Sequence, residues 1–509
     1  MKTPNIWLVS VGALACGIIS SLGFAPIGIW PLTIIGIGAF CLVTRPLTVA
    51  KSALAGYLFG LGFFGVTISY VAVLGVWVAV LLVAVVSCYL LIVGAGIHLV
   101  QRLPFWPLWV ACLWTGMEFC LSRFPLGGFG WSRLAFTSPD SPFGGYLWLL
   151  GAPGVTFLIA LAAALLADCV AASSVKRWLT AILVLVIGAG GWLVDLTPIP
   201  ADTSEIRVGI VQGNVDGSAG PRAMGYAMSV TNNHLAETIT LLAKARTGLT
   251  ENPDIIVWPE NSVDLDPTLD AATARVVSLA SHLASRPLFI GAVMSGPGAE
   301  ERQTSSLWYD ASGELQARYD KRNAVPFGEY TPFKKLVFAL VPMAKWVGKQ
   351  TVPGTKPGVL SVEVNNHPIK VGDIICYELA FDKTVYDVTR YGAQIVLVQS
   401  NNATYSATFQ PKQQFAITRV RAMELRREIV VTTTSSFSGL IGPKGEIRAI
   451  TDEGSAACEV FTIPQRQAIT PAVQTGSIIE IIALIAGLIS AGLVVAKLIR
   501  CRGRIANHE

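Results

Sequence analysis

The stretch Gly372-Asp-Ile-Ile-Cys-Tyr-Glu-Leu-Ala-Phe381 decides how the rest of this chain is interpreted. The apolar pair Ile374 and Ile375 predicts the end of a strand, and the residues from about 381 to 391 predict a helix. Cys376 therefore falls at a turn from strand to helix, where the N–H groups of the helix start point toward the thiol. This position suits a nucleophile, and a cysteine buried in the core for structural reasons is the alternative.

The composition of the 509-residue chain indicates a membrane protein that carries a polar domain. Hydrophobic residues make up 52% of the sequence and charged residues only 14%, a balance typical of membrane proteins. The net charge of +5 comes from basic residues beside apolar segments, so it does not indicate a nucleic-acid partner. We expect three parts: a seven-span region at 1–200, a catalytic domain at 201–475, and an eighth helix with a basic tail at 476–509.

Eight apolar runs are each near the roughly 20 residues that a helix needs to cross a bilayer. They lie at about 6–23, 27–44, 52–70, 74–98, 105–122, 144–172, 178–195 and 477–498. Six further runs follow the first within residues 1–200, which favours a retained first helix over a cleaved signal peptide. The sequence thus predicts an integral membrane protein with an α-helical bundle of eight spans.

Lysine and arginine in the connecting segments predict the orientation of these spans. If the amino terminus is cytoplasmic, ten basic residues fall in cytoplasmic segments and only Arg123 and Arg133 in the short outside loops. An excess of lysine and arginine marks the cytoplasmic side of a membrane protein. We therefore expect both termini in the cytoplasm and the polar domain outside the cytoplasmic membrane.

Cysteine and histidine usage leaves one structural alternative open. Of the nine cysteines, Cys376 and Cys458 are the two in the polar domain. In an oxidising compartment they could form a disulfide, which would exclude a nucleophile at Cys376. The five histidines are too few and scattered for a zinc site. We expect neither a metal nor an organic cofactor.

Glu118 is an ionisable residue inside an expected span, which makes it a candidate for function. It lies shortly before the loop from Arg123 to Arg133. One interpretation is an ion pair with either arginine, and the other is a role in binding a lipid headgroup.

The polar domain alternates strands with helices, a pattern typical of α/β domains. Two hairpins are expected around Ala311–Gly313 and Pro443–Gly445. The remaining expected elements are strands at 207–212, 254–257, 288–293, 369–375 and 394–399, and helices at about 225–246, 272–285 and 412–428.

Polar residues at the ends of the expected strands offer partners for the thiol. A cysteine nucleophile commonly uses a histidine base, but none of the domain's three histidines lies beside a strand end or turn motif. Glu260 could accept the thiol proton, and Lys321 could stabilise a thiolate and an oxyanion. The alternatives are a helix cap for Glu260 and a surface ion pair with Asp320 for Lys321.

Three motifs of the chain resemble those of the nitrilase superfamily. Trp258-Pro-Glu260, Tyr319-Asp-Lys321 and Cys376-Tyr-Glu378 stand in the order of the superfamily's glutamate, lysine and cysteine motifs. The segment Val325-Pro-Phe-Gly-Glu-Tyr-Thr-Pro332 and the eight-span pattern narrow the resemblance to the apolipoprotein N-acyltransferase family. The resemblance covers essentially the whole chain.

The resemblance implies a four-layer αββα sandwich and acyl transfer through a thioester. Members of the family move an acyl chain from a membrane phospholipid to the α-amine of a lipoprotein's amino-terminal, diacylglyceryl-modified cysteine. By motif, Cys376 would be the nucleophile, Glu260 the general base and Lys321 the group that stabilises the oxyanion. The other matches are residues that support the site or bind substrate: Glu329, Tyr377 and Glu378.

The segment from Phe333 to Val347 favours a lipid substrate independently of the resemblance. Its apolar residues are interleaved with Lys334, Lys335 and Lys345, a basic amphipathic pattern that suits a lipid interface. The alternative is a helix that covers the domain's own core.

The chain departs from the family at Asn402, where many members carry aspartate. This change concerns the shape of the pocket and the preferred acceptor, and it leaves the three catalytic positions filled.

A membrane-anchored amidase of the nitrilase type, hydrolysing a small polar substrate, is the alternative function. It would need the same cysteine, glutamate and lysine but would have no use for seven spans or for the amphipathic segment from Phe333 to Val347. A non-enzymatic transporter or receptor would not need all three catalytic positions. We therefore expect a monomeric acyltransferase in the bacterial cytoplasmic membrane, with phospholipid as acyl donor and lipoproteins as acceptors.

Overall fold

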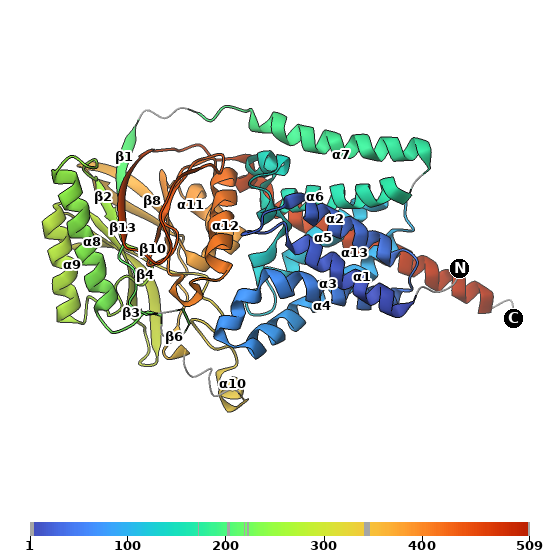
Figure 1. Cartoon of the computed structure of the whole chain (residues 1–509), viewed down its shortest axis with the longest axis horizontal. Helices are drawn as coiled ribbons and strands as arrows, with labels where there is room; N and C mark the ends of the chain where they lie inside the picture. The colour runs from blue at the N-terminus through green and yellow to red at the C-terminus, as the bar shows by residue number, and fades with distance from the viewer. Residues whose placement is uncertain are drawn as a thin grey trace. The chain divides into compact units, whose positions relative to one another are not determined.

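The computed structural model describes residues 5–171, 173–200, 204–217, 219–220, 223–340 and 347–506. The chain divides into two compact units (Figure 1). One unit is formed by Met1–Thr197 with Gln474–Glu509, and the other by Pro198–Val473.

The first unit consists mainly of apolar helices, one for each of the eight predicted runs. They are α1 (Ile6–Ser21), α2 (Trp30–Thr44), α3 (Val49–Thr67), α4 (Val76–Val100), α5 (Trp106–Leu121), α6 (Leu147–Ala171), α7 (Ser174–Asp195) and α13 (Pro471–Ala506). Among the described residues, five segments are long and apolar enough to cross a membrane: Val49–Thr67, Val76–Val100, Pro142–Ala171, Val175–Asp195 and Pro471–Arg500. Helices α1 and α2 are apolar but shorter.

Glycines allow α3 and α4 to pack with their backbones close together. A Cβ atom added to Gly56 would lie 2.1 Å from the carbonyl oxygen of Leu90, and one added to Gly94 would lie 2.3 Å from that of Ser52. No side chain larger than hydrogen fits at either position without moving the partner helix. Such small-residue contacts are typical of helix pairs in membranes, where burial of apolar surface alone provides little driving force.

Glu118 belongs to a buried ionic cluster within this unit. Its carboxylate accepts hydrogen bonds from Thr156 Oγ1 at 2.8 Å and from Arg133 Nε at 3.4 Å. Arg133 also lies 3.5 Å from Glu480 on α13, and Arg123 pairs with Glu480 rather than with Glu118. The ion pair with Arg133 is therefore present, and the same cluster holds α13 to the loop that follows α5.

The second unit contains two β-sheets. The first has the strand order β13-β1-β2-β3-β4-β5, with β6 paired to β4, and the second has the order β12-β11-β10-β9-β8-β7. The first sheet consists of β1 (Glu205–Gln212), β2 (Ile255–Val257), β3 (Leu288–Ser295), β4 (Glu301–Tyr309), β5 (Leu315–Asp320), β6 (Gln350–Thr351) and β13 (Ala457–Pro464). The second consists of β7 (Val359–Val364), β8 (His367–Ile375), β9 (Ile395–Ser400), β10 (Ile429–Thr433), β11 (Gly439–Ile441) and β12 (Ile447–Ile450).

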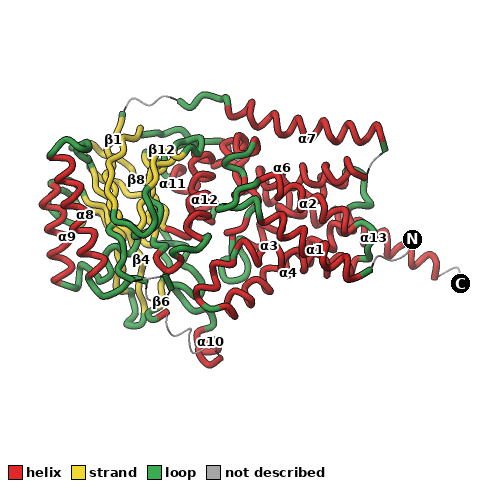
Figure 2. The backbone as a smooth tube through the Cα atoms, in the orientation of Figure 1, coloured by secondary structure: helices red, strands yellow, loops and turns green. Residues whose placement is uncertain are grey.

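Helices cover the outer faces of both sheets and complete the predicted αββα sandwich. Helices α8 (Ser229–Arg246) and α9 (Ala271–Ala284) lie on the first sheet, and α11 (Asp382–Arg390) and α12 (Gln410–Leu425) lie on the second (Figure 2). Strand β9 is buried along its whole length because both of its faces are covered. The edge strand β7 instead alternates buried and exposed residues.

The main core of this unit lies between the two sheets. Val208 and Trp308 of the first sheet belong to one buried cluster with Val371 and Leu397 of the second. A second cluster fills the space between the first sheet and its helices. Strand β8 contributes Ile369, Val371 and Ile375 to the cluster between the sheets.

Several elements differ from the predicted ones. Strands β6, β7, β10 and β13 had no predicted counterpart. The basic helix predicted at 412–428 ends at Leu425 because Arg426 adopts a left-handed conformation with φ 48°. Within the predicted amphipathic segment, Lys334–Leu340 forms helix α10. Its residues 341–346, which include Lys345, lie outside the described residues.

Candidate active site

Cys376 stands at a sharp turn between strand β8 and helix α11. It is the first residue of a short 3-10 helix, Cys376–Ala380, which leads directly into α11. The backbone of Cys376 has φ 51°, a left-handed conformation that is uncommon for a residue with a side chain. The predicted change from strand to helix is therefore present, and it holds the thiol in a strained position of the kind that recurs at functional sites.

The side chain of Glu378 fixes this turn through hydrogen bonds. It is fully buried, and its Oε2 accepts a hydrogen bond from the Ile375 N–H at 2.9 Å. Its Oε1 accepts from the Tyr319 hydroxyl at 2.8 Å and from the Arg322 N–H at 2.6 Å. One carboxylate thus joins the cysteine turn to the residues on either side of Lys321.

Tyr377, the residue between Cys376 and Glu378, is buried in the interior. It is 6% exposed, and its ring meets that of Phe381 edge to face at 5.1 Å.

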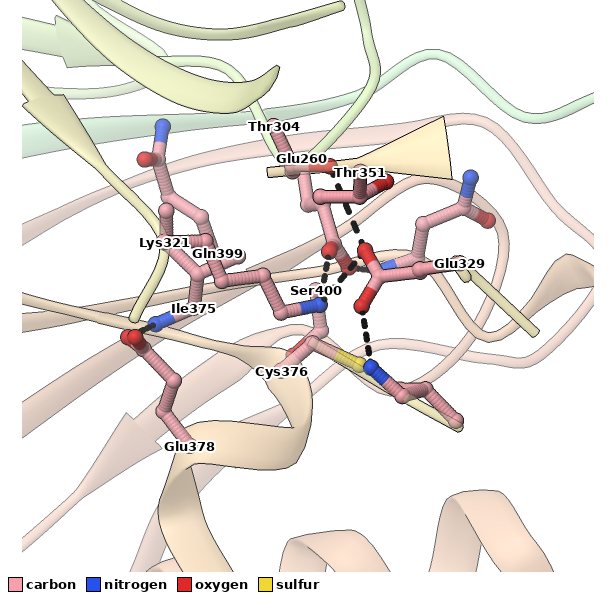
Figure 3. Close-up of polar contacts among 12 residues, drawn as sticks. Glu260, Thr304, Lys321, Glu329, Thr351, Ile375, Cys376, Glu378, Gln399 and Ser400 are labelled. Atoms are coloured by element: carbon pink, nitrogen blue, oxygen red, sulfur yellow. Dashed lines mark hydrogen bonds and ion pairs between the residues drawn. The ribbon is translucent and has the colours of Figure 1, made fainter. Parts of the chain in front are cut away.

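Lys321 lies between two carboxylates, as Figure 3 shows. Its Nζ is 2.7 Å from Glu260 Oε1 and 3.0 Å from Glu329 Oε1, and the side chain is 1% exposed. The alternative surface pairing with Asp320 is wrong, because Asp320 accepts hydrogen bonds from Arg318 and other neighbours instead. The structure therefore brings together the residues of three separate sequence motifs.

The two carboxylates are themselves fixed by hydrogen bonds. Glu260 Oε2 accepts from the Asn401 N–H at 2.8 Å, and the cap of α9 is Asp270, so the helix-cap alternative for Glu260 is wrong. Glu329 Oε2 accepts from the Val325 N–H at 2.7 Å. Because both groups are held by backbone amides, neither can swing away from Lys321 without losing a hydrogen bond.

Burial and charge together set the protonation of the site. Burial raises the pKa of the Cys376 thiol, and the nearby carboxylates of Glu260 and Glu329 raise it further. Burial opposes the charge on Lys321, but Glu260 and Glu329 raise the pKa of its ammonium well above the usual value. The resting site thus holds a neutral thiol beside a permanent cation, and a base must remove the thiol proton before the sulfur can attack.

Both cysteines of the unit are free thiols. Cys458 is buried in β13, where it packs in the cluster between the first sheet and its helices. Cys376 lies at the other sheet, at the end of β8. The disulfide alternative for these two residues is therefore wrong.

A cluster of side-chain amides beside the thiol was not predicted from the sequence. Cys376 Sγ donates to Gln414 Oε1 over 3.8 Å. Asn402 Nδ2 donates to the side-chain oxygens of Gln410 at 2.9 Å and Gln414 at 2.7 Å, and Gln414 Nε2 donates to Ser400 Oγ at 2.5 Å. The signal available in the sequence was the i, i+4 spacing of the two glutamines, which places both on one face of α12.

The side-chain amide of Asn402 therefore serves as a hydrogen-bond donor to two glutamine oxygens. We expect Asn402→Asp to lower the free energy of unfolding by about 2–3 kcal/mol, since a buried carboxylate would face two amide oxygens that had lost their donor. Unfolding of the purified protein in detergent would measure this effect. The control is Asn366→Asp at an exposed turn position with φ 62°. Equal stability of the two variants would show that the glutamine amides reverse and that Asn402 is not required as a donor.

The geometry suits acyl transfer through a covalent intermediate. Cys376 offers a thiol, and beside it Glu260 offers a carboxylate and Lys321 a cation, both of them buried. Electrostatic interactions are stronger in such a site than in water. An oxyanion formed from a carbonyl group beside the sulfur would find the positive charge already in place.

Two family models match this chain, one in the helical unit and one in the unit with the two sheets. Residues 16–165 match the family model described as apolipoprotein N-acyltransferase N-terminal domain, and residues 207–467 match the one described as carbon-nitrogen hydrolase.

Curated relatives match nearly the whole chain. The apolipoprotein N-acyltransferase of Mycolicibacterium smegmatis is 31% identical over 505 residues, covering 94% of this chain and 83% of the relative. The one from Photobacterium profundum is 26% identical and covers 91% of each chain. Among solved structures, an amidase from Nesterenkonia sp. AN1, with acrylamide added to its active-site cysteine, is 17% identical. It covers 50% of this chain and 92% of the amidase, with a TM-score of 0.36. The expected resemblance is confirmed, and the chain belongs to the apolipoprotein N-acyltransferase family.

Proposed function

We propose that this protein takes an acyl chain from a membrane phospholipid as a thioester on Cys376. It then transfers the chain to the α-amine of the diacylglyceryl-modified cysteine at the amino terminus of a lipoprotein. The observation that carries the proposal is the buried contact of Lys321 with Glu260 and Glu329 next to a thiol on a strained turn. Membership of the family supports the identity of both substrates.

In the first half-reaction, Glu260 accepts the proton of the Cys376 thiol, and the sulfur attacks the ester carbonyl carbon of the phospholipid. The carbonyl oxygen becomes an oxyanion that Lys321 stabilises. When the carbon–oxygen bond to the glycerol breaks, the leaving oxygen takes the proton from Glu260, and a lysophospholipid departs. The acyl chain remains as a thioester.

In the second half-reaction, the lipoprotein α-amine attacks the thioester carbonyl carbon. Glu260 accepts a proton from the amine, and Lys321 again stabilises the oxyanion. The carbon–sulfur bond then breaks, the amide is left behind, and the proton returns from Glu260 to the sulfur. The site regains the neutral thiol with which it began.

Two exposed phenylalanines favour a lipid substrate over a small polar amide. Phe327 is 47% exposed and Phe333 is 72% exposed, and they flank the loop that holds Glu329. Both have left-handed backbones, with φ 62° and 49°. Large exposed apolar side chains beside a catalytic loop suit contact with acyl chains, as does the basic helix α10 that follows.

The full topology is part of the proposal. All eight apolar helices cross the cytoplasmic membrane, both termini lie in the cytoplasm, and the sandwich lies outside as part of a monomer. The distribution of lysine and arginine supports this orientation. Helices α1, α2 and α5 contain 16, 15 and 16 residues, which is shorter than the ~30 Å of hydrocarbon requires at about 1.5 Å per residue. Adjoining turns or local thinning of the bilayer would cover the difference.

Mass spectrometry of the purified protein incubated with phospholipid tests the proposal directly. We expect one acyl adduct, located on the peptide that contains Cys376 and absent from Cys376→Ala. The matched control is Cys458→Ala, which removes the other thiol of the unit and should keep the adduct. Adding a diacylglyceryl-cysteine peptide should move the acyl chain to its amine. Release of the chain to water alone would favour the amidase, and no adduct at Cys376 would overturn the mechanism.

The pH dependence of thioester formation should report on Glu260. Burial raises the pKa of Glu260 above its ordinary value of 4.5, and the Glu329 carboxylate adds to this rise although Lys321 opposes it. The rate should therefore fall as the pH falls through this raised pKa, because a protonated Glu260 cannot accept the thiol proton. Glu329→Gln removes one cause of the rise, so the midpoint should move to lower pH. Glu363→Gln, at an exposed position on β7, should leave the midpoint unchanged.

A further inference from the structure

Three buried side chains join the nucleophile strand to the residues beside Glu260. Asp373 lies on β8, three positions before Cys376, and is completely buried. Its Oδ2 is 2.6 Å from Ser306 Oγ on β4, and the same hydroxyl is 2.5 Å from Gln399 Oε1 on β9. Gln399 Nε2 in turn donates to the carbonyl oxygen of Trp258 at 2.5 Å.

The donors in this chain of hydrogen bonds can be assigned by counting the hydrogen atoms that each side chain can offer. Gln399 must direct its NH₂ group at Trp258, because two carbonyl oxygens at 2.5 Å would repel each other. Its Oε1 therefore faces Ser306 and can only accept, so the single hydrogen of the Ser306 hydroxyl is used there. The contact of 2.6 Å between Ser306 and Asp373 then needs a hydrogen from the other side.

We infer that Asp373 is a protonated carboxylic acid that donates to Ser306, and that the chain Asp373–Ser306–Gln399 is a positioning device for the active site. It fixes the Trp258 carbonyl, two residues before the base Glu260, relative to the strand that carries Cys376. The inference rests on the proposed roles of Glu260 and Cys376.

The surroundings of Asp373 agree with an uncharged acid. Burial raises the pKa of its carboxyl well above the usual value, and the carboxylates of Glu378 and Glu260 raise it further. The Ser306 hydroxyl and the Ile374 N–H act in the opposite direction. A neutral polar group is tolerated in a core far better than a buried charge without a counterion, which is very costly.

The position of the chain explains why it would affect catalysis. Asp373 and Gln399 belong to the second sheet, and Ser306 and the strand leading to Trp258 belong to the first. Gln399 stands opposite Ile375, the neighbour of Cys376. The chain therefore crosses the core between the sheets at the level of the site, where it ties the base and the nucleophile together. Apolar packing alone would hold the sheets with less directional precision.

Infrared spectroscopy tests the protonation. The spectrum of the full-length protein near neutral pH should contain the carbonyl band of a buried protonated carboxylic acid, and Asp373→Asn should remove that band. The band should persist in Glu363→Gln, which alters an exposed carboxylate. If the wild-type and Asp373→Asn spectra are identical in this region, Asp373 is ionised and the inference is overturned.

Alkylation of Cys376 by iodoacetamide tests the positioning without any acyl donor. Ser306→Ala breaks the chain, so the alkylation rate near neutral pH should fall by up to about 100-fold, and its pH profile should shift, because the base no longer lies correctly against the thiol. The control is Ser305→Ala at the adjacent buried residue, whose hydroxyl donates to Asp320 instead. Equal rates in the two variants would overturn the positioning role.

Asp373→Asn supplies a second comparison if Ser306→Ala does not fold. Its amide NH₂ can donate to Ser306 as the protonated acid does, so the alkylation rate should stay within about threefold of wild type. A loss as large as that caused by Asp373→Ala would overturn the inference. Failure of the wild-type protein to accept an acyl chain from phospholipid would contradict the proposed function, whereas the infrared and alkylation results would still decide this inference.

Discussion

Lys321→Met is expected to slow thioester formation at Cys376 by about 100- to 1,000-fold, the usual cost of removing one stabilising group from an oxyanion site. The same change should destabilise the unit by about 3–5 kcal/mol, because it leaves Glu260 and Glu329 buried without their shared cation. Stopped reactions analysed by mass spectrometry give the rate, and unfolding in detergent gives the stability. These two losses have different causes and can be separated.

The double variant Lys321→Met with Glu329→Gln separates them. Removing one of the two carboxylates should restore part of the stability, while the rate should stay low because the cation is still missing. Lys383→Met is the matched control, since Lys383 forms a surface ion pair and its side chain is 75% exposed. Exposed pairs contribute at most about 1 kcal/mol, so this control should resemble the wild type. A double variant with restored rate would contradict the role given to Lys321.

Glu378→Ala is expected to abolish detectable thioester formation and to destabilise the unit by about 3–5 kcal/mol. The carboxylate accepts hydrogen bonds from the Ile375 N–H, the Tyr319 hydroxyl and the Arg322 N–H. Each buried donor left unpaired costs roughly 1–3 kcal/mol. This loss is a large part of the roughly 5–15 kcal/mol that stabilises a typical domain. Because the lost hydrogen bonds are those that hold the strained turn at Cys376, we expect this turn to relax.

Two measurements check this expectation. Alkylation of Cys376 reports whether the thiol keeps its position, and thermal unfolding reports the loss of stability. Glu363→Ala on the edge strand β7 is the control, because Glu363 is exposed. If Glu378→Ala forms the thioester at the wild-type rate, the turn is held by packing, and the carboxylate does not determine the position of the nucleophile.

The elements that follow a local pattern could be predicted from the sequence. The apolar runs that became α1 to α7 and α13, and the strand ending at Ile375, are visible in neighbouring residues alone. The end of α12 was placed too late because the chain leaves the helix through a left-handed arginine, Arg426, where a glycine would have given a signal. Strand β10 begins three residues after Arg426, directly after the end of the predicted helix, and was not predicted.

The choice of partners for polar residues could not be predicted in the same way. From the sequence, Arg123 and Arg133 were equally possible partners for Glu118. In the structure Arg133 pairs with Glu118, and Arg123 pairs with Glu480, which lies in the last helix of the chain. The contact of Asp373 with Ser306 likewise depends on how two sheets face each other. Motif order brought Glu260, Lys321 and Cys376 to attention, whereas the hydrogen bonds that hold them depend on contacts between distant segments.

The first and last strands of the sandwich lie beside each other. Strand β13 pairs with β1 along its whole length, from Glu205 opposite Pro464 to Gln212 opposite Ala457. The polypeptide therefore enters and leaves this unit at neighbouring points. A domain with adjacent ends can be inserted into a host chain with little disturbance of the host. This geometry explains how a domain of the carbon-nitrogen hydrolase type can be accommodated as an insert between the apolar helices α7 and α13, with its own fold intact.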